Sequence, residues 1–130
     1  MYKTITSYNN DQSATNKKIC KALQVEINSV LKTAESKVWH AHPVWFINGN
    51  PIVGYGKVID GVQLLFWSGQ SFDEPGLKKE GSFKASEIRY ANIDEVNLKD
   101  LRRWLKKAKT IQWDYKNIVK RRGRLIKLKV

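Results

Sequence analysis

Apolar and polar residues alternate along the chain with two different periods, and the change of period divides the chain into three parts. Over residues 13–33 apolar residues return every three or four positions, which predicts one amphipathic helix. Between residues 38 and 91 they occur in short alternating runs, which predicts strands. Beyond Asn97 the helical period returns. The apolar stripes are Ile19, Leu23, Ile27, Val30 and Leu31 in the first helix and Leu98, Leu101, Leu105 and Ala108 in the last.

Glycine, proline and asparagine divide the middle of the chain into four expected strands. Asn48-Gly49 lies between two apolar runs, and this pair favours a tight hairpin because both residues accept positive φ. Gly69, Pro75 and Gly76 mark residues 68–79 as a long loop. The strands are therefore expected at residues 38–47, 51–55, 62–67 and 81–91.

The two ends of the chain differ from its centre. Residues 1–12 are polar and are expected to form a loose arm, whereas residues 13–122 form the folded domain. Residues 111–119 keep a helical spacing, which predicts that the last helix continues to a stop at Gly123. Residues 123–130 form a basic tail that alternates apolar and charged residues, and it fits either a short strand or a mobile segment.

Strands gathered between helices predict an α+β fold. We expect one antiparallel sheet of four to six strands, with the N- and C-terminal helices packed mainly on one face. The single cysteine, Cys20, lies on the stripe of the first helix and is expected to be a buried thiol. No stretch approaches the roughly 20 apolar residues of a membrane span, and residues 1–18 lack an apolar signal core, which predicts a cytoplasmic protein without a membrane partner.

Both faces of the predicted sheet carry large apolar side chains. Because side chains alternate along a strand, Leu64 and Phe66 point to one face while Leu65 and Trp67 point to the other. A sheet that helices cover on one side alone normally has a polar outer face. The second face therefore needs a cover: the helices or tail of the chain itself, a second copy in a homodimer, or a bound ligand.

The net charge of +12 is concentrated at one end. Residues 99–130 hold 13 Lys and Arg against two acids, while residues 1–98 are almost balanced. A segment this basic attracts polyanions, and the interleaved Trp104, Trp113 and Tyr115 complete a composition typical of weak nucleic-acid binding. The alternative is a solvated helix whose aromatics face the core. The residues expected to contact nucleic acid are Lys120, Arg121, Arg122 and Arg124.

Three segments resemble the uncharacterised bacterial domain family called YdhG-like. They are the run from His42 to Tyr55, the run from Leu64 to Gly69, and the stretch from Gly76 through Phe83-Lys84 to Ile88-Arg89-Tyr90. The resemblance spans roughly residues 15–108. It implies a sheet packed against helices at both chain ends, related to the frataxin-like and YjbR-like folds. Some relatives are described as iron chaperones, which implies an intracellular iron-chaperone role as an alternative. The four lysines of the first helix (Lys17, Lys18, Lys21 and Lys32) disagree with the acidic ridge that iron delivery would use.

The sheet face and its loops supply the candidate binding site. We expect a non-enzymatic domain that binds a small anionic ligand or a partner protein, with aromatic side chains for contact area and an arginine for an anionic group. Arg89 has an alternative partner in an internal carboxylate such as Asp73 or Glu74. The candidate site residues are Trp39, His42, Trp45, Trp67 and Arg89.

Metal binding and catalysis have weaker sequence support. His40 and His42 are two positions apart, so they are expected on one face of one strand, where they would be the candidate metal ligands. The chain has no G-x-S-x-G elbow, Walker loop or G-x-G-x-x-G run. Neither an enzyme nor a cofactor is therefore expected.

Overall fold

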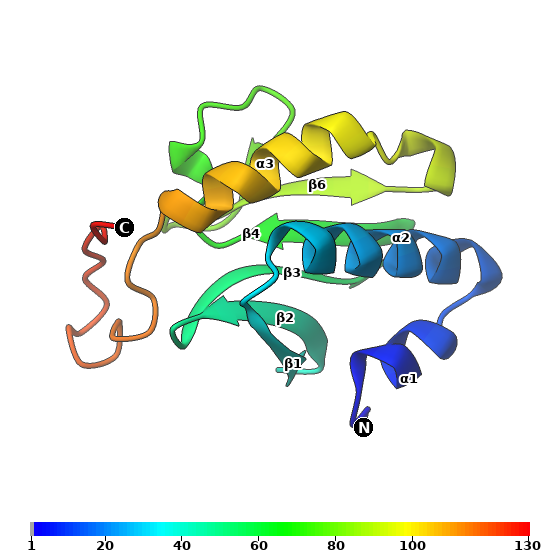
Figure 1. Cartoon of the computed structure of the whole chain (residues 1–130), viewed down its shortest axis with the longest axis horizontal. Helices are drawn as coiled ribbons and strands as arrows, with labels where there is room; N and C mark the ends of the chain where they lie inside the picture. The colour runs from blue at the N-terminus through cyan, green and yellow to red at the C-terminus, as the bar shows by residue number, and fades with distance from the viewer. Residues whose placement is uncertain (1) are drawn as a thin grey trace.

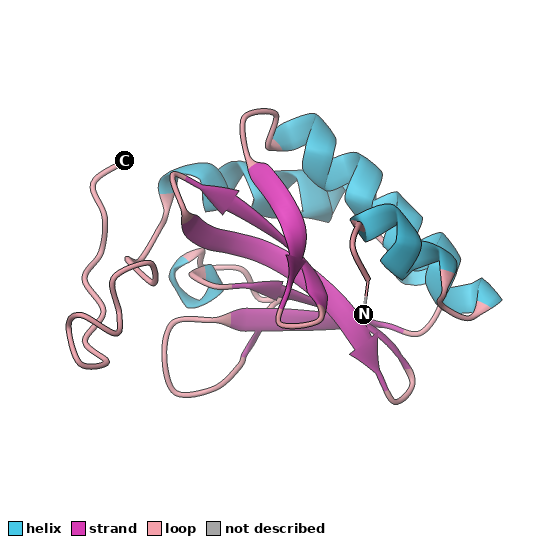
Figure 2. Ribbon diagram, turned by 90° about the horizontal axis from the view of Figure 1, so that it is seen from below, coloured by secondary structure: helices cyan, strands magenta, loops and turns pink. Residues whose placement is uncertain are grey.

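Two long helices lie across one face of a six-stranded antiparallel sheet in the computed structural model, which describes residues 2–130 (Figure 1; Figure 2). The predicted α+β fold is confirmed. The helices are α2 (Ala14–Val30) and α3 (Leu98–Thr110), and the strand order is β1-β2-β3-β4-β6-β5. The strands are β1 (Glu35–Trp39), β2 (His42–Ile47), β3 (Asn50–Val58), β4 (Gly61–Phe66), β5 (Lys78–Lys79) and β6 (Ser86–Tyr90), with 3-10 turns η1 (Gly69–Ser71) and η2 (Ile93–Glu95).

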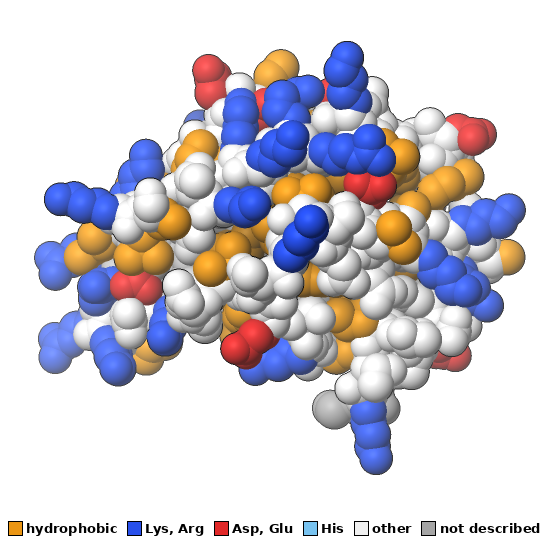
Figure 3. All heavy atoms as spheres, in the orientation of Figure 1, with side chains coloured by type: hydrophobic (Ala, Val, Ile, Leu, Met, Phe, Trp, Pro, Cys, Tyr) orange, Lys and Arg blue, Asp and Glu red, His pale blue; other side chains and the backbone are white. Residues whose placement is uncertain are grey.

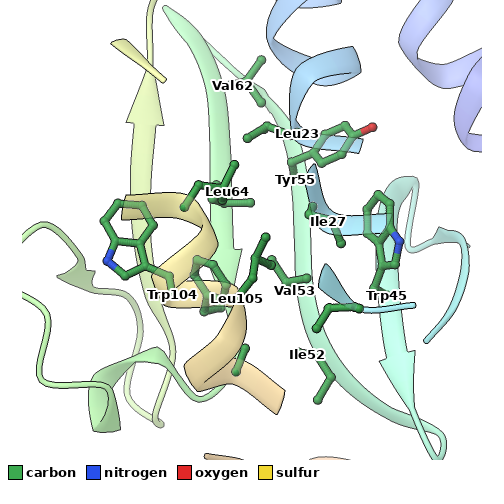
Figure 4. Close-up of a cluster of buried hydrophobic side chains, with 14 of the residues drawn as sticks. Leu23, Ile27, Trp45, Ile52, Val53, Tyr55, Val62, Leu64, Trp104 and Leu105 are labelled. Atoms are coloured by element: carbon green, nitrogen blue, oxygen red, sulfur yellow. The ribbon is translucent and has the colours of Figure 1, made fainter. Parts of the chain in front are cut away.

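The core lies between the helices and the sheet (Figure 4). Leu23 and Ile27 of α2 are fully buried against the sheet, as the apolar stripe predicts. Leu105 of α3 is also fully buried, and Leu64 of β4 lies on the sheet face that meets both helices. The predicted burial of Cys20 is confirmed, and this burial raises the pKa of its thiol to about 12. Within residues 2–130, no helix combines the length and the apolarity needed to cross a membrane.

The expectation of a loose N-terminal arm over residues 1–12 is wrong for residues 5–10. A short helix, α1 (Ile5–Asn10), is capped by Thr4, whose side chain accepts a hydrogen bond from the backbone of Ser7 at 3.0 Å. Ile5 and Tyr8 are buried, and the Tyr8 hydroxyl accepts from the backbone of Lys57 at 3.0 Å. The polar composition concealed this helix because its two apolar residues are too few to make a visible stripe.

The first predicted strand, residues 38–47, is two strands in the structure. β1 and β2 pair across a two-residue turn at His40 and Ala41, which have φ of 50° and 69°. Positive φ at both central residues is the geometry of a tight hairpin, which Asn and Gly usually supply. His-Ala lacks that sequence signal, so the turn was missed. The turn predicted at Asn48-Gly49 is confirmed, with φ of 50° and 79°.

Residues 111–130, called the C-terminal segment below, do not continue the last helix, so that prediction is wrong. α3 ends at Thr110, and the chain then runs along the end of the sheet in extended and turn conformations. Asn50 explains the change, because its side chain donates to the carbonyl of Trp113 at 2.9 Å and accepts from the backbone of Lys116 at 3.0 Å. The tail folds back, and Leu128 donates its backbone N–H to Gln112 at 2.8 Å.

Candidate functional site

The strand register divides the candidate site residues between the two faces of the sheet. Trp45 pairs with Val53, and Val53 pairs with Phe66, so Trp45 points toward the helices. It is 0% exposed, and its indole N–H donates to Asn28 at 2.8 Å. The prediction that Trp45 and Trp67 belong to one site is therefore wrong, because the two side chains point to opposite faces of the sheet.

The face turned away from α2 and α3, called the outer face below, carries an aromatic cluster. The ring of Trp39 lies 5.3 Å from that of Phe46 and 6.3 Å from that of Trp67, measured between centroids. The Lys37 ammonium lies 5.0 Å from the centre of the Phe46 ring. Phe46 is buried, while Trp39 and Trp67 are half-buried. The large side chains of the outer face thus cover one another in part, while the C-terminal segment lies beyond one end of the sheet (Figure 2).

Next to the aromatic cluster, β3 has two residues without side chains. Gly54 pairs with Val44 on one side and Leu65 on the other, and Gly56 pairs with Gln63. These glycines form the floor of a shallow pocket of about 110 Å³, called the glycine pocket below. Its lining includes His42, Val44, Gly54, Gly56, Gln63, Leu65 and Trp67.

Two side chains in the wall of the glycine pocket, those of His42 and Trp67, lie close to the backbone of its floor. A Cβ atom at Gly56 would lie 2.5 Å from Nδ1 of His42, and one at Gly54 would lie 3.3 Å from Cζ3 of Trp67. A Cβ at Gly54 would also lie 2.7 Å from the carbonyl oxygen of Pro43. The close approach of an imidazole and an indole is therefore possible only because β3 has glycine at these two positions.

Arg89 lies one strand away from the pocket, next to Gln63 in the register. Its Nε donates to Glu87 at 2.7 Å, and Glu87 also accepts from Gln63 at 3.0 Å. Arg89 itself is exposed. The carboxylate that holds it is Glu87, two residues away on the same strand face, and not Asp73 or Glu74. A hydrogen bond from the neighbouring Glu80, supported by Arg89 and Gln63, lowers the pKa of Glu87 to about 2.

The two histidines do not share a strand face as expected, because the β1–β2 turn falls between them. His40 lies in the turn, where its ring is 4.3 Å from that of Trp39. His42 begins β2 and is exposed beside Gly56. Among residues 2–130, no three His, Cys, Asp or Glu side chains lie together in a way that could hold a metal ion.

Glu74, which the sequence singled out only as a partner for Arg89, holds the loop before β5 to α3. Its carboxylate is 5% exposed and accepts two hydrogen bonds from Arg103, at 2.7 and 2.9 Å. It also accepts from the indole of Trp104 at 2.9 Å and from Lys107 at 2.7 Å. Chiefly because of Arg103, the pKa of Glu74 lies well below its ordinary value. No sequence motif marks this cluster, because the loop and the helix are separated by about 30 positions.

The residues predicted to contact nucleic acid divide into two groups. Arg121 forms an ion pair with Asp114 inside the C-terminal segment. Lys120, Arg122 and Arg124 are exposed. The aromatics interleaved with these charges face inward: Trp104 is 2% exposed, and the Trp113 indole donates to Ser71 at 2.9 Å. The alternative interpretation, in which these rings pack on the core, therefore fits Trp104 best.

Of the predicted site residues, the structure brings His42 and Trp67 together in the pocket. The Trp39 ring lies tilted beside that of Trp67, and Arg89 lies beyond Gln63. Gln63 and the two glycines were missed as site residues. The signal that could have found them is a pair of glycines in the middle of an apolar strand, which often marks a close approach to the backbone. Comparison of the chain with protein-family models, with curated proteins and with solved structures finds no match, so the resemblance to YdhG-like domains remains a prediction.

Proposed function

We propose that this chain is a non-enzymatic binding domain that takes a small, planar, anionic ligand in the glycine pocket. The observation that carries the proposal is a floor without side chains, walled by an imidazole and an indole, on the sheet face that α2 and α3 leave open. Glycine weakens a central strand because it packs no side chain and loses more backbone entropy on folding. Glycine at positions 54 and 56 lets the rings of His42 and Trp67 lie close against the strand, and the proposed ligand packs in the space between these rings.

The size and the walls of the pocket favour a single flat ring. Its volume of about 110 Å³ is close to the roughly 150 Å³ of an apolar cavity that admits benzene. A planar ligand would lie on the backbone between the rings of His42 and Trp67, because aromatic pairs prefer stacked or edge-to-face contacts. The amide of Gln63 supplies a polar group at the wall.

The charges around the pocket favour an anion. Arg89 donates a hydrogen bond from its Nε to Glu87, and its two terminal nitrogens make no hydrogen bond to residues 2–130. Paired guanidinium nitrogens bind a carboxylate in a two-pronged arrangement. Lys57 at the pocket wall is exposed, and Lys37 lies farther along the outer face. We therefore assign the aromatic group to the glycine floor and the anionic group to Arg89.

Titration with benzoate, nicotinate and salicylate, followed by two-dimensional amide NMR, tests this assignment. The amide signals of Gly54, Gly56 and Gln63 should move with at least one of these anions. Benzamide, the neutral match of benzoate, should bind at least tenfold more weakly. If none of the three anions moves the Gly54 and Gly56 signals, the proposal is wrong.

Two variants separate the parts of the assignment. Gly56→Ala should abolish binding, because the added methyl group would lie 2.5 Å from Nδ1 of His42 and would displace this ring from the pocket wall. Arg89→Gln should weaken binding of the anions and leave benzamide unaffected. Arg124→Gln removes the same charge from an exposed position on the C-terminal segment and serves as the control. Equal weakening by Arg89→Gln and Arg124→Gln would contradict a specific anion contact.

The iron-chaperone alternative gains no support from the placement of the acidic residues. Glu26, the one acidic residue of α2, accepts two hydrogen bonds from Arg102 of α3, at 2.8 and 3.0 Å. Lys18 and Lys21 of the same helix are exposed. A surface of this charge repels the hard cations that carboxylate ridges attract.

A further inference from the structure

The C-terminal segment is a folded loop that is fixed to one end of the sheet. Besides its bonds to Asn50, it is held by Ser68, whose hydroxyl accepts from the backbone of Trp113 at 2.9 Å. The hydroxyl of Tyr115 accepts from the backbone of Lys84 at 3.0 Å. The Lys116 ammonium donates to the carbonyl of Asn48 at 3.1 Å. These contacts fix the start of the segment, so the charges that follow have defined positions.

The one acidic residue of the segment is neutralised within it. Asp114 is 4% exposed and accepts two hydrogen bonds from the Asn117 side chain, at 3.0 and 3.2 Å, and one from the Asn117 backbone at 3.2 Å. Arg121 closes the loop through its ion pair with Asp114. Asn117 first, and then Arg121, lower the pKa of Asp114. The loop therefore presents no free negative charge.

The remaining basic residues of the segment have no acidic partner within residues 2–130, and all are exposed. We call them the basic platform: Lys116, Lys120, Arg122, Arg124, Lys127 and Lys129. Figure 3 shows Lys and Arg side chains gathered over this end of the molecule.

Three of the six basic residues of α3 differ from those of the platform. Arg102 is held by Glu26, and Arg103 and Lys107 are held by Glu74. Part of the positive charge of α3 therefore stabilises the fold. Nine basic residues of 99–130 form no ion pair with the described residues: six belong to the platform, and the other three are Lys99, Lys106 and Lys109 of α3.

We propose that the basic platform binds the phosphate backbone of a nucleic-acid duplex without preference for base sequence. A duplex carries about one negative charge per 1.7 Å of its axis, so closely spaced cations displace several counterions at once. This binding site is separate from the glycine pocket and does not depend on the function proposed for it.

The aromatic residues near the platform explain why phosphates are favoured over bases. Proteins that bind single strands stack bases on exposed aromatic rings. Here the Trp113 ring faces the Lys84 ammonium, which lies 4.6 Å from its centre, and the Tyr115 hydroxyl is used by the Lys84 backbone. The platform therefore offers charges without stacking surfaces, and it should bind a duplex more tightly than a single strand of the same length.

Fluorescence anisotropy of the full chain with a labelled random-sequence duplex of about 20 base pairs tests the proposal, because backbone binding predicts a linear fall of log affinity with log salt. The variant Lys120→Gln/Arg122→Gln/Arg124→Gln should reduce the magnitude of that slope by about 2.7, since each phosphate contact contributes about 0.9. Its affinity at 50 mM salt should fall by about tenfold or more. All three residues are exposed, so the melting temperature should not change.

The matched control is Lys18→Gln/Lys21→Gln/Lys32→Gln, which removes the same charge from exposed lysines in and just after α2. This control should keep the slope of the unaltered chain. If both triple variants lower the slope equally, the binding follows net charge alone and the proposal is wrong. Tighter binding of the single strand, or binding of phosphatidylserine vesicles in place of the duplex, would also overturn it.

Discussion

The two faces of the sheet use large side chains in opposite ways. On the covered face, Trp45 and Tyr55 are almost completely buried, and their polar atoms are bonded to Asn28 and Asn9, at 2.8 and 2.7 Å. On the outer face, Trp39 and Trp67 shield each other only in part, and Trp67 lies beside Gly54. The comparison teaches that apolar alternation on both faces need not mean two cores. One face holds the fold together, and the other offers aromatic surface for recognition.

Replacing one tryptophan on each face tests this division most strongly. Trp45→Ala should destabilise the protein by about 3–5 kcal/mol, because it leaves a cavity in the core and removes the partner of Asn28. Trp39→Ala should cost only about 1 kcal/mol, since that ring is half-exposed and loses mainly its contacts with other aromatic rings. Urea unfolding followed by circular dichroism measures both. Equal losses would show that the outer face is also buried in solution, as it would be in a homodimer.

The carboxylates on the two sides of the sheet should also differ in how much they stabilise the protein, with the larger contribution on the covered side. Glu74→Gln should destabilise the protein by about 2 kcal/mol, because it weakens a buried set of charged hydrogen bonds from three residues of α3. Glu87→Gln should cost less, since its partner Arg89 is exposed to water. Thermal unfolding at pH 7 compares the two variants. A larger loss for Glu87→Gln would mean that the outer face carries more of the stability than its exposure indicates.

The stabilising role of Glu74 should also appear in how the unfolding free energy depends on pH in acid. The folded protein lowers the pKa of Glu74 from an ordinary value of 4.5, so it stabilises the ionised form. That stabilisation is fully present above pH 4.5 and is lost progressively as the pH falls toward the folded pKa. The unfolding free energy of the unaltered chain should therefore fall with pH below about 4.5, and that of Glu74→Gln should fall less steeply. Parallel curves from pH 5 to pH 2 would contradict the assigned role of Glu74.

The smallest expected losses of stability come from alanine substitutions of the two glycines of the outer face, and the two losses should differ. Gly54→Ala should cost about 2 kcal/mol, because its methyl group meets the backbone carbonyl of Pro43, which cannot move without disturbing β2. Gly56→Ala should cost under about 1 kcal/mol, since it meets the exposed His42 ring, which can turn away. Chemical denaturation of both variants checks the order. The reverse order would show that His42 is held rigidly and that the pocket wall is less adaptable than proposed.

The sequence determined the parts of the fold that depend on neighbours along the chain. The stripe of Ile19, Leu23 and Ile27 specifies α2, because a helix repeats every 3.6 residues. Asn48-Gly49 specifies the β2–β3 turn, because few other pairs accept positive φ. The alternation in β4 likewise separated Leu64 and Phe66 from Leu65 and Trp67 correctly.

Only the tertiary structure decided how separate segments align, and the candidate site depends on that alignment. The register of β2 with β3 put Trp45 in the core, and the unsignalled turn at His40 and Ala41 separated the two histidines. Asn50 and Glu74 redirect the chain through bonds to residues 63 and 30 positions away, respectively. Sequence periodicity reports which residues are neighbours within one element. Contacts between elements depend on packing that no local pattern encodes.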